Sequence, residues 1–347
     1  MQTTTRRDEI LADPGFGRYL TDHMVTARFA GGEWSAPALE PLDDLRISPA
    51  AMVLHYGQAI FEGLKTYRQP DGSLALFRPF DNAVRFNRSA ERMAMPAFPE
   101  EQFVESCRMV SLADADWVPT KPGQALYLRP FMFATEPNLG VRAAAELLYV
   151  LIASPVDTFF PGGVRPISVR TADAAVRAAP GGVGAAKCAA NYSASLATKS
   201  AAVRDGFDEV LWLDAVEHRW VDELSGMNAF VVRSDGSLVT PPISDTILDG
   251  ITRRSIIELA RSMGIEVVEA PIAVDDWVAD ARAGRVTEAF ACGTAAVVAP
   301  IGQLTTASGS CTMGDGAPGP VTLRLREALV AIQEGRADDP FGWRVKI

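Results

Sequence analysis

Histidine and cysteine are scarce in this chain. Three histidines occur in 347 residues, and they are too few and too scattered to build a metal site or a Ser-His-Asp relay. The four cysteines lie far apart and form no C-x-x-C pair, a spacing that favours reduced thiols over a disulfide framework or a zinc site. The composition therefore argues against a metalloenzyme and against a triad hydrolase.

Long apolar segments and an excess of positive charge are also missing. No segment approaches the roughly 20 uncharged residues of a membrane span, and the polar start from Met1 to Glu9 contains no apolar signal core. The formal net charge is −10, which opposes nonspecific binding to nucleic acid or to an anionic membrane. We therefore expect a cytoplasmic protein that contains no metal and acts on small molecules. Any anionic ligand would be bound by a local group of residues rather than by the net charge.

What the chain does have is enough length and 48% hydrophobic residues for two cores. Its first part mixes strand-like runs with helical patterns, which indicates a mixed α+β and α/β architecture. The proline and glycine run from Ser154 to Gly163 interrupts both periodicities. We predict a smaller N-terminal α+β domain over residues 1–160, an interdomain loop over 161–176 and a larger C-terminal domain over 177–347.

The second half of the chain alternates between helical and strand patterns. Glycines at 206 and 264 follow two helical patterns directly, where a glycine commonly ends a helix. In chain order, we predict a helix over 191–204, strands over 209–213 and 229–232, a helix over 252–263, a strand over 266–268, a loop over 308–320 and a helix over 321–335.

Lys187 stands in a segment of mostly glycine and alanine from Gly181 to Ala190 that contains no other charged residue. A lysine among small residues and near a phenol, Tyr192, suits a Schiff-base enzyme, because its amine must lose a proton to attack an aldehyde. A nucleotide-binding loop requires glycine before the lysine and Ser or Thr after it, whereas this chain has Ala186 and Cys188. A nucleotide-binding regulator is therefore the weaker alternative.

Three further segments carry groups that suit the same chemistry. Glu223 precedes an apolar strand and, if buried, would keep a pyridinium nitrogen protonated. The segment Gly250-Ile251-Thr252 opens a helix and offers amides to an anion, and the turn over 292–296 does the same. Taken singly, each has an ordinary structural interpretation as a turn or a helix start.

Taken in order, these segments resemble the branched-chain amino acid aminotransferases of the class IV (fold type IV) family, which use pyridoxal 5′-phosphate. The resemblance covers nearly the whole chain. The stretches that carry it are His55–Lys65, Phe77–Pro79 with Asn82 and Arg85, Tyr127–Pro130, Gly182–Ser195, Glu223–Asn228, Gly250–Thr252 and Gly293–Ala295.

The resemblance implies a two-domain enzyme with the cofactor at the domain interface. Lys187 would form the internal aldimine and shuttle a proton between the substrate α-carbon and the cofactor. Glu223 would pair with the pyridine nitrogen, and Tyr192 would hydrogen-bond the phenolic oxygen. The residues expected to hold the phosphate are Arg85, Ile251, Thr252 and Thr294.

The resemblance also implies a homodimer and a substrate site. The side-chain pocket would contain Phe16, Tyr56, Phe61 and Tyr127, with Tyr56 reaching the site of the partner subunit. The substrate α-carboxylate would bind Tyr127 and the amides of Ala295 and Ala296, while Arg129 would help to admit the γ-carboxylate of glutamate. Arg177 is expected only as a mobile contact.

The implied reaction is a reversible amino transfer between L-leucine, L-isoleucine or L-valine and 2-oxoglutarate. D-Amino acid transaminases, (R)-amine transaminases and aminodeoxychorismate lyases share the lysine and the glutamate, and they remain alternatives. The pattern Tyr127-Leu128-Arg129 and the chain length favour the branched-chain class. Two departures from relatives are Ala189-Ala190 in place of a Gly-Gly pair, and Ala296 with Ala299 in place of a redox C-x-x-C.

Overall fold

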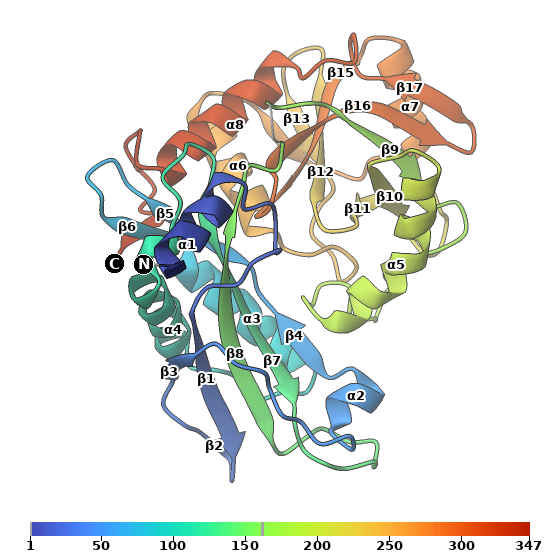
Figure 1. Ribbon diagram of the computed structural model, residues 1–347. Helices are drawn as coiled ribbons and strands as arrows, with labels where there is room; N and C mark the ends of the chain where they lie inside the picture. The colour runs from blue at the N-terminus through green and yellow to red at the C-terminus, as the bar shows by residue number, and fades with distance from the viewer. Residues whose placement is uncertain (1, 161–162) are drawn as a thin grey trace. The chain divides into compact units, whose positions relative to one another are not determined.

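The computed structural model describes residues 2–160 and 163–347 and divides them into two compact units. Unit 1 contains the described residues up to Phe159, the short segment Ala186–Ala189 and the segment Ala331–Ile347. Unit 2 contains the described residues of Phe160–Ala185 and of Ala190–Val330. Figure 1 shows the elements of both units, which are described separately below.

Unit 1 is built on a nine-stranded sheet whose pairs are all antiparallel. Its strand order is β18-β6-β5-β7-β8-β1-β2, with β3 paired to β1 and β4 paired to β7. The longest pair joins β7 to β8, and nearly all of their residues are buried. The strands are β1 (His23–Ala30), β2 (Glu33–Trp34), β3 (Ala38–Pro41), β4 (Ala59–Phe61), β5 (Leu64–Arg68), β6 (Leu74–Phe77), β7 (Ala125–Ala134), β8 (Leu147–Val156) and β18 (Arg344–Lys346).

The helices of unit 1 follow local signals in the sequence. In α3 (Pro79–Arg92), Pro79 occupies the first turn, where its missing N–H and fixed φ are favourable. In α4 (Glu100–Ala113), two glutamates of the first turn complement the helix dipole. Helix α4 packs on β1 and β8, and α3 packs on α4 and β4. The remaining helices of this unit are α1 (Gln2–Ala12), α2 (Met52–Tyr56) and the 3-10 turn η1 (Ala115–Trp117).

Unit 2 is built on a second nine-stranded sheet, with mixed pairing. Its order is β11-β10-β9-β16-β15-β12-β13-β14, with β17 paired to β16, and the pairs β9/β10, β9/β16 and β13/β14 are parallel. The strands are β9 (Ile167–Thr171), β10 (Glu209–Leu213), β11 (Val221–Leu224), β12 (Asn228–Arg233), β13 (Leu238–Thr240), β14 (Val267–Glu269), β15 (Val286–Gly293), β16 (Val297–Thr306) and β17 (Gly309–Thr312).

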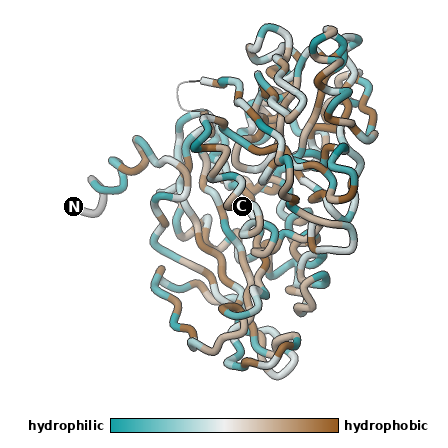
Figure 2. Tube along the Cα trace, turned by 90° about the vertical axis from the view of Figure 1, so that its right-hand side faces the viewer, coloured by the Kyte–Doolittle hydropathy of each residue, from teal (hydrophilic) through white to brown (hydrophobic). Residues whose placement is uncertain are grey.

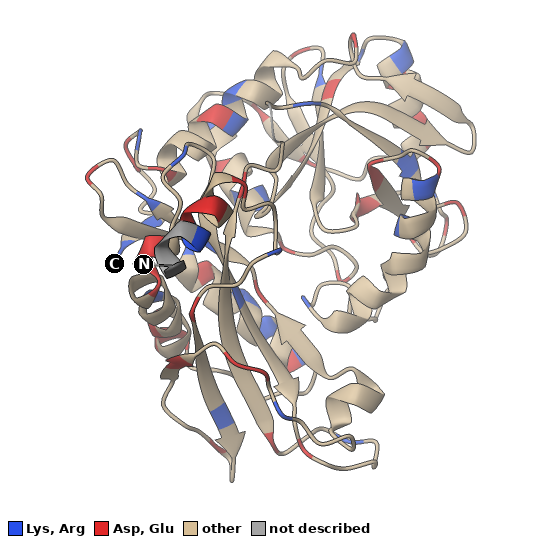
Figure 3. Cartoon of the chain, viewed as in Figure 1, with Lys and Arg blue, Asp and Glu red and all other residues tan. Residues whose placement is uncertain are grey.

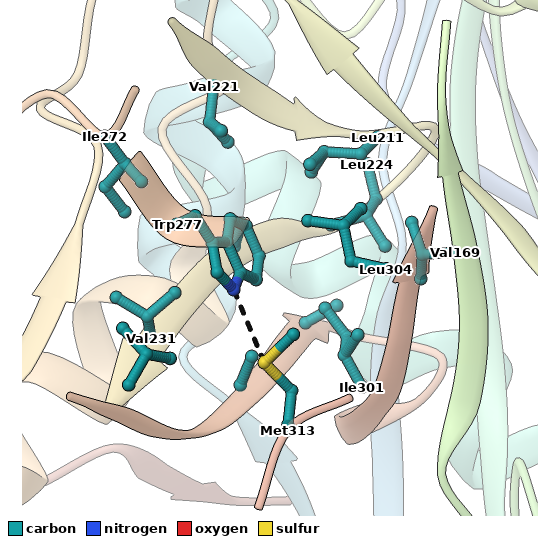
Figure 4. Close-up of a cluster of buried hydrophobic side chains, with 14 of the residues drawn as sticks. Val169, Leu211, Val221, Leu224, Val231, Ile272, Trp277, Ile301, Leu304 and Met313 are labelled. Atoms are coloured by element: carbon teal, nitrogen blue, oxygen red, sulfur yellow. Dashed lines mark hydrogen bonds between the residues drawn. The ribbon is translucent and has the colours of Figure 1, made fainter. Parts of the chain in front are cut away.

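Helices α6 (Ile251–Ser262) and α7 (Val274–Arg282) pack on β15. Figure 4 shows the aliphatic core of unit 2, in which side chains from strands far apart in the sequence surround Trp277 of α7. The indole Nε1 of Trp277 lies 3.4 Å from the sulfur of Met313. Two further helices, α5 (Ala189–Arg204) and α8 (Pro320–Gln333), each cross a boundary between the two units in sequence.

Hydrophobic and hydrophilic segments alternate along the trace (Figure 2), and most of the buried residues are hydrophobic. Most positions of the central strands β8, β10 and β12 are buried. Among the described residues, no helix combines the length and the apolar character needed to cross a membrane.

The predicted mixed fold is confirmed, and three local predictions are wrong. The segment 161–176, predicted as an interdomain loop, contains the central parallel strand β9, although residues 161–162 lie outside the described residues. The predicted loop over 308–320 contains β17, which pairs with β16. Residues 331–347, predicted in the second domain, belong to unit 1, because β18 pairs with β6.

Candidate active site

Lys187 is held in unit 1 through its backbone. Its amide donates to the hydroxyl of Ser89 over 2.9 Å, and its carbonyl accepts from the amide of Phe61 over 3.0 Å. The next residue, Cys188, forms an antiparallel bridge with Ile60. The Nζ atom lies 4.9 Å from the centre of the Phe61 ring. The lysine is therefore presented beside β4 by fixed main-chain contacts, with an aromatic face against its amine.

A fully buried ion pair acts on this lysine, and with it forms what we call the amine cluster: Lys187, Phe61, Glu62 and Arg85. The Glu62 carboxylate accepts from Arg85 Nε over 2.7 Å and from Arg85 Nη2 over 2.8 Å, and it also accepts from Asn82 over 2.7 Å. Burial by itself would raise the pKa of Glu62, but the charge and hydrogen bonds of Arg85, together with Lys187, hold it below its ordinary value. Glu62 is therefore a carboxylate that stays ionised.

Four residues predicted for the substrate site, Phe16, Phe61, Tyr127 and Arg129, lie next to one another in unit 1. The guanidinium of Arg129 lies 4.8 Å from the centre of the Phe61 ring and donates to the hydroxyl of Tyr127 over 3.0 Å. The ring of Phe16 meets the ring of Tyr127 edge-on at 5.1 Å. Gly63 makes this arrangement fit, because a Cβ at that position would lie 2.0 Å from the Tyr127 hydroxyl.

Tyr56 is not part of this group within the chain. It ends α2, it is 41% exposed, and its hydroxyl donates to the carbonyl of Leu139. Its predicted role at a partner subunit remains a prediction.

In unit 2, Glu223 lies on β11 and is buried. Its Oε1 pairs with Arg177 Nη2 over 2.7 Å, and its Oε2 accepts from Asn228 Nδ2 over 3.0 Å. We call Glu223, Arg177, Asn228, Asp222 and Thr246 the carboxylate cluster. In this cluster, the buried Glu223 carboxylate has a cationic partner in Arg177 and an oriented donor in Asn228.

The expectation for Arg177 as a mobile contact is wrong. Arg177 is only 7% exposed, and besides Glu223 its Nη2 contacts the carbonyls of Gly184 and Thr246. The glycine run before the lysine is therefore fixed to the loop around Thr246. Asp245 adds to this, since it accepts from the amide of Gly181 over 2.6 Å.

The start of α6 lies against the same cluster. Its N-cap, Gly250, provides no capping side chain, and Ile251 and Thr252 are buried. A Cβ on Gly250 would lie 1.9 Å from Asn228 Oδ1, and Asn228 also donates to the carbonyl of Leu248 over 3.0 Å. First-turn amides have no intrahelical acceptor, and the helix dipole favours an anion there. Glu223 and the start of α6 are thus fixed to each other through Asn228.

The turn Thr294–Ala296 lies at the same end of the sheet. It joins β15 to β16, and Gly293 pairs with Val297 across it. A Cβ on Gly293 would meet the carbonyl of Gly226 at 3.2 Å, which places this turn beside the turn that follows Glu223. Three predicted residues, Thr294, Ala295 and Ala296, therefore lie near Glu223 within unit 2.

Tyr192 lies in the first turn of α5 and is half-buried. The N-terminal part of this helix carries no charged residue (Figure 3). The neighbouring Asn191 donates to the carbonyl of Val183 over 2.7 Å, which fixes the helix start to the glycine run. The hydrogen bond that we expect from the Tyr192 hydroxyl to a cofactor remains a prediction.

Sequence reasoning assigned no role to several residues that position the predicted ones. These are Glu62 beside Arg85, Ser89 beside Lys187, and Asn228 and Thr246 in the network around Glu223. Arg177, expected only as a mobile contact, pairs with Glu223. Glu62 and Asn228 stand inside the stretches that carried the resemblance, so their positions were visible there, although their partners were not.

Comparison with known proteins places these clusters in context. Residues 59–304 match the family model of Amino-transferase class IV. A probable branched-chain-amino-acid aminotransferase of Streptomyces coelicolor is 49% identical over 341 residues, covering 98% of this chain and 94% of that protein. A branched-chain-amino-acid aminotransferase of Mycolicibacterium smegmatis is 49% identical over 350 residues, covering 99% of this chain and 95% of that protein.

Solved structures agree with this match. The branched-chain amino acid aminotransferase of Escherichia coli superposes with a TM-score of 0.78 at 28% identity, covering 93% of this chain and 98% of that one. The T.th. branched-chain amino acid aminotransferase with pyridoxamine 5′-phosphate gives a TM-score of 0.76 at 30% identity, covering 92% and 97%. The chain belongs to the class IV aminotransferases and, within them, to the family of branched-chain-amino-acid aminotransferases.

Proposed function

We propose that this enzyme uses pyridoxal 5′-phosphate to transfer the amino group reversibly between L-leucine, L-isoleucine or L-valine and 2-oxoglutarate. Transamination is the reaction of its family. The observation that carries the proposal is the fixed presentation of Lys187, whose amide and carbonyl are both held while its amine lies against the face of an aromatic ring.

The residues fit the cofactor by their chemistry. In unit 2, a buried carboxylate that suits a protonated ring nitrogen is fixed through Asn228 to a helix start that suits a phosphate. Thr252 and Thr294 add hydroxyls, and the amide of Ile251 belongs to that first helical turn. Arg85 supplies a buried guanidinium from unit 1. We assign the phosphate to Arg85, Ile251, Thr252 and Thr294. We assign the ring nitrogen to Glu223 and the phenolic oxygen to Tyr192.

When bound, pyridoxal 5′-phosphate supplies a carbon that accepts the amino group and a ring that takes up the electrons of the α-C–H bond. Lys187 is the base that removes the α-proton and returns it at the acceptor carbon. Glu223 keeps the proton on the ring nitrogen, because a buried carboxylate with oriented donors strongly favours a cation beside it. Arg85 with Glu62 holds a fixed charge pattern that acts on Lys187.

The aromatic and cationic residues around Tyr127 are assigned to the substrate. Phe16, Phe61 and Tyr127 supply apolar surface for a branched side chain, and Tyr56 joins them from the partner subunit of a homodimer. Tyr127 and the amides of Ala295 and Ala296 bind the α-carboxylate. Arg129, whose guanidinium lies over the Phe61 ring, donates hydrogen bonds to the γ-carboxylate of glutamate. We place this enzyme in the cytoplasm.

A comparison of two lysines tests the proposal. Lys187→Ala should abolish the near-visible absorbance band of the protein and lower turnover with leucine by more than about 10³-fold, because both the covalent anchor and the base are lost. The matched control is Lys199→Ala, whose lysine pairs with Glu209 and which should leave both readouts unchanged. A Lys187→Ala protein that keeps its band and its turnover contradicts the proposal.

A donor panel then separates the members of the family. We expect keto acid release from leucine, isoleucine and valine but not from D-alanine or an (R)-amine. Analytical ultracentrifugation measures the dimer, and mixing Lys187→Ala with Tyr56→Ala protein tests the shared site. If Tyr56 serves the partner, the mixed dimers contain one site with both substitutions and one intact site, and they regain activity that neither variant has alone.

A further inference from the structure

Asp222, the residue before Glu223, is a buried carboxylate with an incomplete set of partners. It is 6% exposed, and its Oδ1 accepts from the hydroxyl of Thr246 over 3.1 Å. Its Oδ2 is buried and accepts no hydrogen bond from any described residue. A buried carboxylate oxygen that accepts no hydrogen bond is unfavourable, so the presence of this group calls for an explanation.

The same network contains a second incomplete group. Arg177 pairs with Glu223, and its Nη2 also contacts the carbonyls of Gly184 and Thr246, but its Nε has no partner among the described residues. Thr246 joins the two carboxylates, since its carbonyl accepts from Arg177 while its hydroxyl donates to Asp222. Asp222, Thr246, Arg177 and Glu223 therefore form one continuous chain of contacts.

The guanidinium of Arg177 pairs directly with Glu223 and also acts on Asp222 through its charge, without a hydrogen bond to it. The charges that act on Asp222 are Arg177, which favours its ionised form, and Asp214 and Asp245, which oppose it. Burial raises the pKa of Asp222 to about 6, against the Thr246 hydrogen bond and Arg177. Asp222 thus changes its charge near pH 6.

We propose that Asp222 is a positioning residue that competes with Glu223 for Arg177 and thereby sets how strongly Glu223 holds a protonated ring nitrogen. This inference rests on the proposed function of Glu223. When Asp222 is ionised, it shares the guanidinium, so less of the Glu223 charge is neutralised and the ring nitrogen is held more tightly. When Asp222 is protonated, Arg177 neutralises Glu223 alone, and the ring nitrogen is held more weakly.

The experiment titrates the full-length protein with pyridoxal 5′-phosphate by absorbance between pH 5 and pH 8. The ratio of the dissociation constant of Asp222→Asn to that of the wild type cancels the titration of the cofactor itself. We expect this ratio to be near unity at pH 5 and to rise about tenfold by pH 7.5, with a midpoint near pH 6. A ratio that does not change with pH overturns the proposal.

Two further variants exclude a purely structural effect. Thr246→Val removes the hydrogen bond that favours ionised Asp222, so the pH dependence of cofactor binding should move to higher pH. This variant tests the proposal even if Asp222→Asn does not fold. In a Glu223→Gln background, Asp222→Asn should have no further pH-dependent effect, because the coupling acts through Glu223. An unshifted dependence in Thr246→Val, or an undiminished effect in the Glu223→Gln background, overturns the proposal.

A control and a reference keep the two proposals distinguishable. Asp235→Asn changes an exposed turn carboxylate in the same unit, and it should leave the binding curve unchanged. If the wild type binds the cofactor and Lys187→Ala loses the absorbance band, the proposed function stands whatever Asp222 does. If the wild type binds no pyridoxal 5′-phosphate, the proposed function fails first, and the role of Asp222 fails with it.

Discussion

The two units compensate their buried charges in different ways. In unit 1, Glu62 and Arg85 match one to one, with two short hydrogen bonds between them and further donors on the carboxylate. In unit 2, Arg177 is paired with Glu223 and also acts on Asp222, and both Arg177 and Asp222 keep an unpartnered atom among the residues that the structure describes. Because Glu62 has its own cationic partner, it stays ionised. Asp222 depends on a guanidinium that is already paired with Glu223, so its charge can change with the pH of the solvent.

The two carboxylates should also respond to acid with opposite signs. The pKa of Glu62 is lowered in the folded protein, so the stability it contributes is present above its unfolded pKa of 4.5 and is lost as the pH falls through the folded value. The pKa of Asp222 is raised from 3.8 to about 6, so between these values the folded state binds more protons, and stability falls as the pH rises.

Breaking the matched pair should have the largest effect. Glu62→Ala leaves Arg85 buried without its carboxylate, so we expect the free energy of unfolding to fall by about 3–5 kcal/mol. Urea unfolding monitored by circular dichroism measures the change. The control is Glu105→Ala, which removes an exposed partner of Arg108 and should leave the unfolding midpoint where it is. An equal loss of unfolding free energy in the two variants would mean that the buried ion pair contributes no more to stability than the exposed one.

A smaller effect should follow from crowding the substrate residues of unit 1. The Cβ of Gly63→Ala would displace the Tyr127 hydroxyl, so we expect a loss of about 1–3 kcal/mol in stability and a rise of about tenfold in KM for leucine. Urea unfolding measures the change in stability and steady-state kinetics measure KM, while the absorbance band should not change. Gly226→Ala is the control, because its Cβ meets nothing within 4 Å. An unchanged KM in Gly63→Ala would remove Tyr127 from the substrate site.

The smallest effect sharpens the contrast in unit 2. The side chain of Asp222→Asn cannot ionise, so the loss of stability that Asp222 contributes as the pH rises from about 4 to about 6 should be absent in this variant. Thermal unfolding at half-unit pH intervals should show the two melting curves converging at the acid end, with Asp222→Asn higher by a few degrees near neutral pH. Parallel curves over this range would show that Asp222 does not titrate there.

Elements with a local signal could be predicted from the sequence. Strand β10 was predicted with its observed bounds, and α6 ends just before Gly264, whose φ is +75°. Strands β9 and β17 could not be predicted from the sequence. Strand β17 consists of Gly, Ser, Cys and Thr, and it forms only because β16 pairs with it. The same holds for β9, which depends on β10 and β16.

The candidate site divides along the same line. Lys187, Glu223 and the start of α6 carry short signals in the sequence, and a family resemblance organises them. Arg177 is a single cation in a segment of alanine and glycine, and nothing local indicates that it lies against Glu223 or Thr246. Such pairings come from loops that meet only in three dimensions, so they required the structure.

The discontinuous make-up of unit 1 has a consequence for how the protein is made. The segment that contains Lys187 joins unit 1 from between two stretches of unit 2, and the edge strand β18 pairs with β6 from near residue 345. A ribosome that has released only the first 160 residues has therefore not yet supplied the catalytic lysine or the edge strand of this unit. Unit 1 reaches its full set of hydrogen bonds only after residue 346 has been synthesised, and its separate expression as a contiguous fragment is expected to fail.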